Sequence, residues 1–219
     1  MNNFTHRNER YKKVNFAFLI LYIATSIYGI WSAVMEPNYL TAFLAFSGII
    51  LLAVPPIFYK VFKLKPTEDV NFLFYIFCYF SVTIGNGLYG IQRIPYFDKV
   101  LHFSSGVLIA FFGFILFRFL KHNRIIEPEK DYPLLITFVN SFNLAIAVIW
   151  ELYEYAIYVV AGVDALNFTT TGPHDTMGDI LVCAMGGVIV SIWLYSYYKK
   201  NKPGYFMRIY EHFCFLNNK

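Results

Sequence analysis

Acidic and histidine side chains occur at helical spacing in three apolar segments of the second half of the chain. Residues three or four apart lie on one face of a helix, so each pair is presented in one direction. Carboxylate and imidazole donors together suit a divalent ion such as zinc, manganese or magnesium. The candidate metal ligands are therefore these three pairs: Asp98 and His102, Glu151 and Glu154, Asp175 and Asp179.

A bound ion would also explain how several carboxylates can lie together, because neighbouring carboxylates cannot all stay ionised unaided. Such an ion can activate a water molecule for hydrolysis. A metal-free site is the alternative, in which a glutamate that retains its proton acts as an acid and an aspartate acts as a base. The candidate catalytic residues are Glu151, Glu154 and Asp179.

The elements that carry these residues are long apolar runs. Of the 219 residues, 58% are hydrophobic and 15% are charged, whereas soluble domains carry about 25% charged residues. Crossing the hydrocarbon core takes about 20 apolar residues in a helix, and six segments meet or approach that length. The composition therefore predicts an all-α, six-helix transmembrane bundle. Its predicted spans are Val14–Val34, Tyr39–Tyr59, Val70–Ile91, Pro95–Phe117, Pro133–Val160 and Thr176–Tyr198.

Basic residues alternate between the connections, which predicts the orientation. The amino-terminal arm, the second and fourth connections and the tail are rich in Lys and Arg, and the other connections hold few. By the positive-inside rule both termini are cytoplasmic. We expect residues 1–199 to form one membrane domain and residues 200–219 a cytoplasmic tail that could lie in the interface. The basic residues are Arg7, Arg10, Lys12, Lys13, Lys60, Lys63, Lys65, Arg118, Lys121, Arg124, Lys130, Lys199, Lys200, Lys202 and Arg208.

This orientation places the three pairs at one depth. At 1.5 Å per residue, Glu151 lies about 14 Å and Glu154 about 9 Å below the outer end of the fifth span. His102 and Asp179, on spans that run inward, lie about 6–10 Å below the same surface. A charge at a helix centre costs about 2.5–3.5 kcal/mol, so such residues must face the bundle interior and find partners. The sequence thus predicts a polar site in the extracytoplasmic leaflet.

Several of these residues have a simpler explanation as well. Asp98 and Asp175 stand where helices begin and could be N-caps, and His174 could be a loop histidine. The first three spans hold almost no ionisable residues, and Asn86 is their main polar exception. The cysteines have no ligand-like spacing, so they predict neither a disulfide framework nor a zinc site. They are Cys78, Cys183 and Cys214.

Three ordered motifs resemble the YjdF-like family of uncharacterised bacterial inner-membrane proteins. They are FDKVLHF at 97–103, WELYEY at 150–155 and DTMGDI at 175–180, and the resemblance covers about residues 70–198. It implies a D-x-x-x-H element at Asp98 and His102, an E-x-x-E element followed by Tyr155, and a W-D-T-x-x-D element in which His174 replaces the usual tryptophan. The first motif also resembles VanZ-like proteins, which are associated with glycopeptide resistance and the cell envelope.

Three functions are compatible with these residues. The first is an enzyme, such as a metal-dependent hydrolase or transferase, acting on a lipid or lipid-linked substrate in the outer leaflet. The second is a proton- or cation-coupled transporter or channel, with polar residues of the fifth span lining an inner path. The third is a non-catalytic envelope scaffold. The net charge of +4 comes from clustered basic residues, so membrane lipid rather than nucleic acid is the expected partner. The resemblance to the YjdF-like family implies that the membrane is a bacterial inner membrane.

Overall fold

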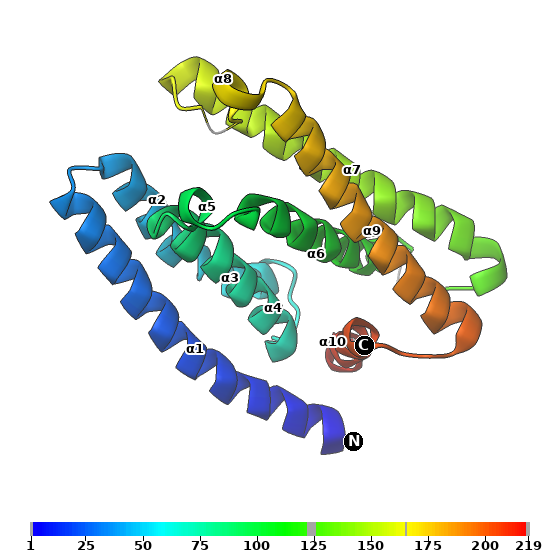
Figure 1. Ribbon diagram of the computed structural model, residues 1–219. Coiled ribbons are helices and arrows are strands. Elements are labelled where there is room, and N and C mark those ends of the chain that lie inside the picture. Colours follow the sequence, from blue (N-terminus) through cyan, green and yellow to red (C-terminus); the bar gives the residue numbers. More distant parts are fainter. Residues whose placement is uncertain (1, 122–125, 165, 218–219) are drawn as a thin grey trace. The chain divides into compact units, whose positions relative to one another are not determined.

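A computed structural model describes residues 2–121, 126–164 and 166–217. Arg124 and the last two residues of the predicted tail lie outside this part of the chain. Within it the secondary structure is helical (Figure 1). The elements are α1 (Asn2–Met35), α2 (Tyr39–Leu51), α3 (Val54–Val61), α4 (Glu68–Cys78), the π-helix η1 (Tyr79–Gly87), α5 (Gly90–Arg93), α6 (Phe97–Leu120), α7 (Pro128–Ala161), α8 (Phe168–Thr171), α9 (His174–Lys200) and α10 (Tyr205–Asn217).

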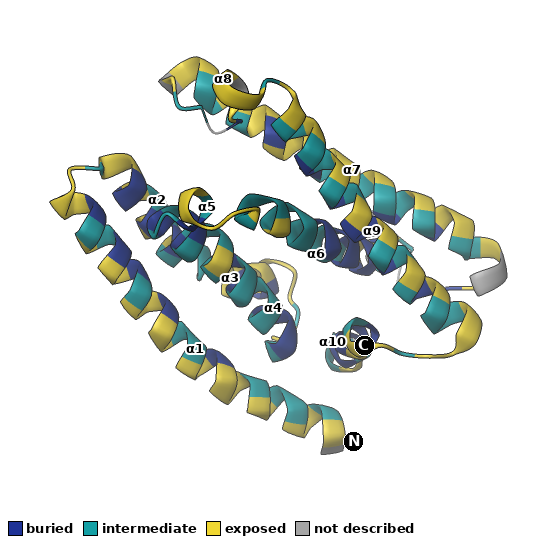
Figure 2. Cartoon of the chain, viewed as in Figure 1, coloured by how far each residue is buried: buried dark blue, intermediate teal, exposed yellow. Residues whose placement is uncertain are grey.

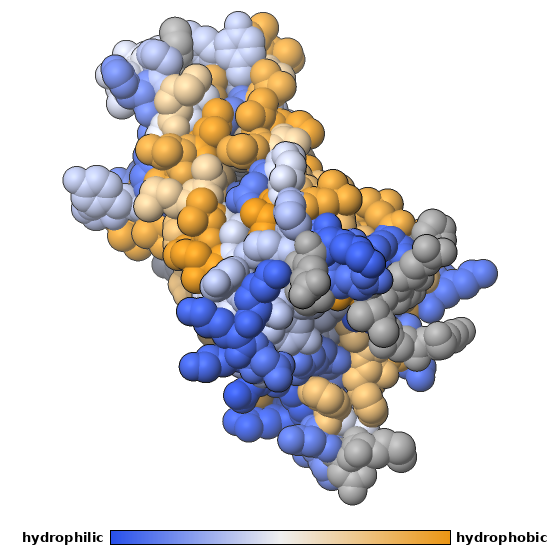
Figure 3. Space-filling model, turned by 90° about the vertical axis from the view of Figure 1, so that its right-hand side faces the viewer, coloured by the Kyte–Doolittle hydropathy of each residue, from blue (hydrophilic) through white to orange (hydrophobic). Residues whose placement is uncertain are grey.

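Within the described ranges, six helical stretches are long and apolar enough to cross a membrane, which confirms the predicted all-α, six-span fold. Large apolar side chains such as those of Trp31, Phe43 and Leu181 are exposed along them (Figures 2 and 3). Patches of this kind are rare on soluble monomers but are covered by lipid in a bilayer. The stretches are Asn3–Met35, Tyr39–Val61, Glu68–Gly87, Phe97–Arg118, Lys130–Val160 and His174–Lys200.

The second and third spans are not uniform α-helices. The second is interrupted after Leu51, and α3 restarts with Pro55 in its first turn, where a missing backbone N–H is tolerated. In the third, α4 passes into η1 at Tyr79. η1 packs closely against α2, because a Cβ added at Gly87 would lie 3.1 Å from the Cβ of Ala45.

The described chain divides into two compact units. The first comprises Met1–Asp98 and Ile209–Lys219, and the second comprises Lys99–Arg208. In the first unit α1 packs against α2, α4 and η1. The region predicted to be an interfacial tail contains α10, whose residues from Ile209 onward belong to this unit, with Ile209 and Phe213 buried.

A buried ion cluster lies in the first unit, where the sequence predicted few ionisable residues. Asp69 and His212 are fully buried. The Oδ2 atom of Asp69 accepts hydrogen bonds from Nε of Arg7 (2.7 Å) and Nδ1 of His212 (2.9 Å), and Phe4 stacks on the imidazole ring. The prediction missed this cluster because it started the third span at Val70, one residue after Asp69.

The second unit contains most of α6 together with α7, α8 and α9. α7 and α9 lie side by side (Figure 1). Two glycines bring α6 and α9 together: a Cβ added at Gly106 would lie 2.3 Å from the carbonyl oxygen of Cys183, and one at Gly186 would lie 2.6 Å from the backbone nitrogen of Val107. Small residues of this kind allow membrane helices to approach closely. They hold the predicted site residues of the two helices at a fixed separation.

Candidate functional site

Lys99 on α6 joins the two aspartates of α9. Its Nζ donates to both carboxylate oxygens of Asp179 at 2.8 Å, to the carboxylate of Asp175, and to the carbonyl oxygen of Asp175 at 3.3 Å. The Asp179 side chain is 4% exposed, compared with 16% for Asp175 and 29% for Lys99. The lysine therefore compensates part of the negative charge that the sequence assigned to a metal ion.

The sequence-based prediction gave Lys99 no role in the site. The signal that would have found it is its spacing, because Lys99 lies three residues before His102 on the same helix and so projects from the same face. A lysine inside an apolar helix must also find an acidic partner. Both observations were available in the sequence.

His102 lies between carboxylates from two helices. Its Nε2 is 3.8 Å from Oδ1 of Asp179 on α9, and its Nδ1 is 4.0 Å from Oε1 of Glu151 on α7. Both distances are too long for direct hydrogen bonds. Two ligands that each lie about 2.0–2.2 Å from a shared metal ion are about 3–4.4 Å apart. The separation of Nε2 and Oδ1 is within that range.

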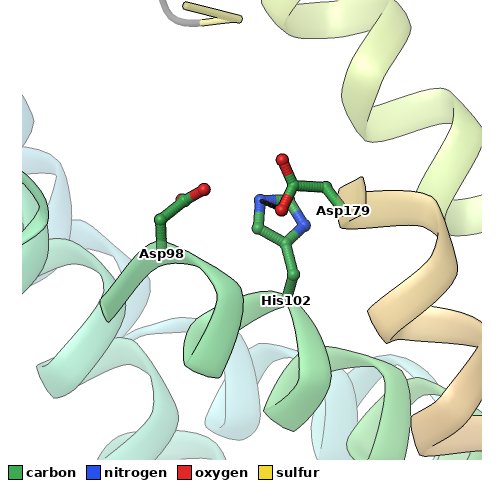
Figure 4. A group of neighbouring side chains, drawn as sticks. All are labelled: Asp98, His102 and Asp179. Carbon is green, nitrogen blue, oxygen red and sulfur yellow. Dashed lines mark ion pairs between the residues drawn. The ribbon is translucent and has the colours of Figure 1, made fainter. Parts of the chain in front are cut away.

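Asp98 completes a group of three potential donors. One donor atom from each of Asp98, His102 and Asp179 lies within 4.8 Å of the other two. Among the described residues, this is the one group of at least three His, Cys, Asp or Glu side chains that could hold a metal ion. Figure 4 shows Asp98 and His102 on successive turns of α6, with Asp179 approaching from α9. Asp98 immediately precedes the second unit and belongs to the continuous helix α6. Three of the six predicted metal ligands therefore lie together.

The two glutamates of α7 differ in their surroundings. Glu151 is buried and faces His102. Glu154 is partly exposed and accepts a hydrogen bond of 2.8 Å from Nε1 of Trp150, one turn earlier on its own helix. The geometry therefore brings Glu151 to the imidazole, while the roles of both glutamates as ligands remain predictions.

The predicted residues at the start of α9 also separate. Asp175 lies in the first turn and accepts a hydrogen bond of 2.6 Å from Nδ2 of Asn167 in addition to its contact with Lys99. The N-cap residue of α9 is Pro173, so the N-cap explanation of Asp175 is wrong. His174, the first residue of α9, is exposed.

Cys183 lies behind His102 and was assigned no role from the sequence. Its thiol donates to the carbonyl oxygen of His102 (3.1 Å), which also accepts from Oγ of Ser105 (2.8 Å), and its Sγ is 3.9 Å from Nδ1 of the imidazole. The available signal was its position four residues after Asp179, which places both on one face of α9. These contacts tie the backbone of α6 to α9 directly below the site.

Polar side chains continue along α7 and α9 beyond Cys183. Nδ2 of the fully buried Asn143 donates to the carbonyl oxygen of Cys183 (2.8 Å), and Nδ2 of Asn140 donates to Oγ of Ser191 (2.8 Å). About two turns before Asn140 on α7, the hydroxyl of Tyr132 donates to the carbonyl oxygen of Ser191 (3.3 Å). The inner path predicted for a transporter comprised Thr137, Asn140, Ser141 and Asn143, of which Asn140 and Asn143 lie at the α7–α9 contact.

Comparison with known proteins identifies the family. A family model described as "Predicted membrane protein (DUF2238)" matches residues 16–200, which include all the candidate site residues. Neither the comparison with curated proteins nor that with solved structures gave a match. The six spans and this match together make the protein a multi-pass membrane protein in a lipid environment. The chain belongs to the DUF2238 family of predicted membrane proteins.

Proposed function

We propose that the protein is a metal-dependent hydrolase or transferase that acts on a lipid or lipid-linked substrate in the outer leaflet of a bacterial inner membrane. The observation that carries the proposal is the convergence of Asp98, His102 and Asp179, whose donor atoms lie within 4.8 Å of one another on helices long and apolar enough to span a membrane. Intramembrane ionisable residues are functional candidates by default, because burying them is costly. The three motifs also favour a YjdF-like member of the family.

The donor set fits zinc, manganese or magnesium. Asp98, Nε2 of His102 and Asp179 would hold the ion. Glu151, near the opposite ring nitrogen, would orient the imidazole, as carboxylates beside ligating histidines commonly do. The ion would supply a Lewis acid and an activated water molecule. Asp175 and Glu154 were also predicted as ligands, but each has other partners. Asp175 accepts hydrogen bonds from Lys99 and Asn167. Glu154 accepts one from Trp150.

The chain's own residues would manage the protons of the reaction. In hydrolysis of a phosphate or acyl ester, water adds to the phosphorus or carbonyl carbon and the bond to the leaving oxygen breaks. The proton from water passes to a carboxylate of the site, which then returns it to the leaving oxygen. In group transfer an alcohol replaces water, and the same carboxylate accepts its proton.

Aromatic residues beside the glutamates support an amphiphilic substrate. Trp150, Tyr153 and Tyr155 on α7 are exposed. Aromatic residues of this kind gather where lipid headgroups meet the acyl chains. A lipid headgroup at this level would bring a phosphate or ester bond to the depth predicted for His102 and Asp179.

The test is turnover by the purified full-length protein with defined lipids. Phospholipids and a polyprenyl diphosphate are supplied with Mn²⁺, Zn²⁺ or Mg²⁺, or with EDTA, and released headgroup or phosphate is measured. Asp98→Asn and Asp179→Asn are expected to reduce turnover by at least a hundredfold, and Glu151→Gln by about 10–100-fold. Glu127→Gln, at an exposed carboxylate that pairs with Lys130, is the control. Full activity of all three site variants on an identified substrate would end the proposal.

The polar contacts between α7 and α9 favour a second candidate, a proton- or cation-coupled transporter. They extend from Cys183 through Asn143 and Ser191 toward Tyr132. Flux of protons or divalent ions into proteoliposomes would be compared between the wild type, Glu154→Gln and Asn143→Leu. If the wild type carries ion flux without any lipid substrate and both variants abolish that flux, the protein is a transporter. Lipid turnover without ion flux would favour the enzyme.

A further inference from the structure

Lys99 binds the carboxylate of Asp179, which is also one of the three grouped donors of the candidate site. We propose that Lys99 is a tethered cation that neutralises Asp179 while no ion is bound, and that a divalent ion displaces its ammonium group onto Asp175. This inference rests on the proposed function in one respect, that an ion binds between Asp98, His102 and Asp179. It adds a determinant of affinity and of selectivity between divalent and monovalent ions.

The geometry at Asp179 sets up the competition. Nζ of Lys99 lies 2.8 Å from both Oδ1 and Oδ2 of this carboxylate. Oδ1 of Asp179 is also the oxygen 3.8 Å from Nε2 of His102, and Asp179 is one of the three grouped donors. An ion bound to Asp179 and His102 would therefore lie on the same carboxylate as the ammonium group. Like charges so close repel, and the repulsion is weakly screened where Asp179 is buried.

Asp175 is a ready second position for the ammonium group. Lys99 already donates to its carboxylate and to its carbonyl oxygen. The lysine stem passes over Gly178, since Cε and Nζ lie 3.7 and 3.8 Å from the position of a Cβ there. Gly178 lies between the two aspartates in sequence. Because the four-carbon stem of lysine is flexible, the ammonium group can move from Asp179 to Asp175 without movement of either helix.

The carboxylate of Asp175 is also held in its orientation by a residue other than Lys99. Nδ2 of Asn167 donates to Oδ2 of Asp175 at 2.6 Å, whereas Lys99 contacts Oδ1. The two oxygens of Asp175 are therefore held by different partners, and the carboxylate stays in place when the ammonium group arrives.

Ion selectivity follows from the charges. Lys99 brings one positive charge to two aspartates, so a monovalent ion gains no advantage over the ammonium group that it must displace. A divalent ion interacts twice as strongly with the same carboxylate. The tethered lysine therefore excludes Na⁺ and K⁺ from the site and also lowers its affinity for the divalent ion.

The experiment measures Mn²⁺ binding by calorimetry to the full-length protein in detergent at one fixed pH, with and without a large excess of Na⁺. Lys99→Met is expected to bind Mn²⁺ at least tenfold more tightly than the wild type and to become sensitive to Na⁺. Lys99→Arg keeps the positive charge and is expected to stay within threefold of the wild type. Lys121→Met removes a lysine paired with Asp131 at the far end of α6 and is the matched control, expected to leave binding unchanged.

The outcomes separate this inference from the proposed function. If the wild type binds Mn²⁺ and Lys99→Met binds it no more tightly, the tethered-cation role is overturned and the metal site stands. If neither protein binds Mn²⁺, Zn²⁺ or Mg²⁺, both are overturned.

A structure of the wild type with Mn²⁺ keeps the inference testable if Lys99→Met fails to fold. Nζ within hydrogen-bond reach of Asp175 alone supports the inference. Nζ still bound to both oxygens of Asp179 beside the ion overturns it.

Discussion

The ammonium group of Lys99 and the carboxylate of Asp179 lie on different helices, yet Nζ is 2.8 Å from both carboxylate oxygens. The contact joins α6 to α9. It also pairs two charges, and burying either one alone inside a membrane protein would be costly. It also means that a buried acidic group in this protein does not need a metal ion for charge compensation. Any ion that binds at Asp98, His102 and Asp179 must compete with the protein's own cation.

Asp179→Asn is expected to lower the stability of the protein as well as its activity. Removing one partner of a fully buried ion pair costs about 3–5 kcal/mol. Because Lys99 is 29% exposed, solvent screens the positive charge that remains. We therefore expect the free energy of unfolding to fall by about 2 kcal/mol. The free energy of unfolding in mixed micelles measures this. The exposed control Glu127→Gln is expected to change it by less than about 0.5 kcal/mol, and an equal loss in both variants would contradict the assignment.

Glu151→Gln is expected to be more damaging than Glu154→Gln. Glu151 faces Nδ1 of His102, whereas Glu154 accepts a hydrogen bond from Trp150 of its own helix. Loss of a carboxylate behind a ligating histidine typically lowers metal affinity or activity about 10–100-fold. Binding of Mn²⁺ and lipid turnover measure the two variants side by side. A larger loss in Glu154→Gln would assign the main role to Glu154.

Gly106→Ala is expected to force α6 and α9 apart. Its Cβ would lie 2.3 Å from the carbonyl oxygen of Cys183, which is backbone and cannot turn away. Overpacking of this kind costs about 1–3 kcal/mol. Gly178→Ala is the matched control, because its nearest new contact is an ordinary 3.7 Å from Cε of Lys99. Thermal unfolding in detergent distinguishes them, and equal melting temperatures would contradict the close helix contact.

Asp69→Asn is expected to destabilise the first unit by about 3–5 kcal/mol, because it removes the negative charge that Arg7 and His212 share in a buried site. Limited proteolysis should then cut α10 sooner than in the wild type. Glu9→Gln, an exposed acidic residue of α1, is the control. Unchanged protection of α10 in Asp69→Asn would mean that the cluster does not hold this helix.

The number and class of the helices follow from local properties of the chain. An apolar run of about 20 residues has few alternatives to a membrane helix, because backbone polar groups must be satisfied within the segment. Helical spacing likewise identified the faces that carry Asp98 with His102 and Asp175 with Asp179. The apolar runs did not reveal the breaks near Leu51 and Tyr79. The first break precedes Pro55 and Pro56, which are a local signal for the end of a helix.

The partners of each polar face were decided by tertiary structure. Periodicity shows which residues of a helix share a face but not how that helix is rotated against its neighbours. Contacts between helices set that rotation: Gly106 of α6 packs against Cys183 of α9, and Asn143 of α7 donates to the carbonyl oxygen of Cys183. In this arrangement Glu151 of α7 faces His102. The same holds for Asp69 and His212, which are 143 residues apart in sequence and share a buried hydrogen bond. Local sequence thus established the six spans and the three ionisable pairs, and long-range packing selected Lys99 as the cation between the aspartates.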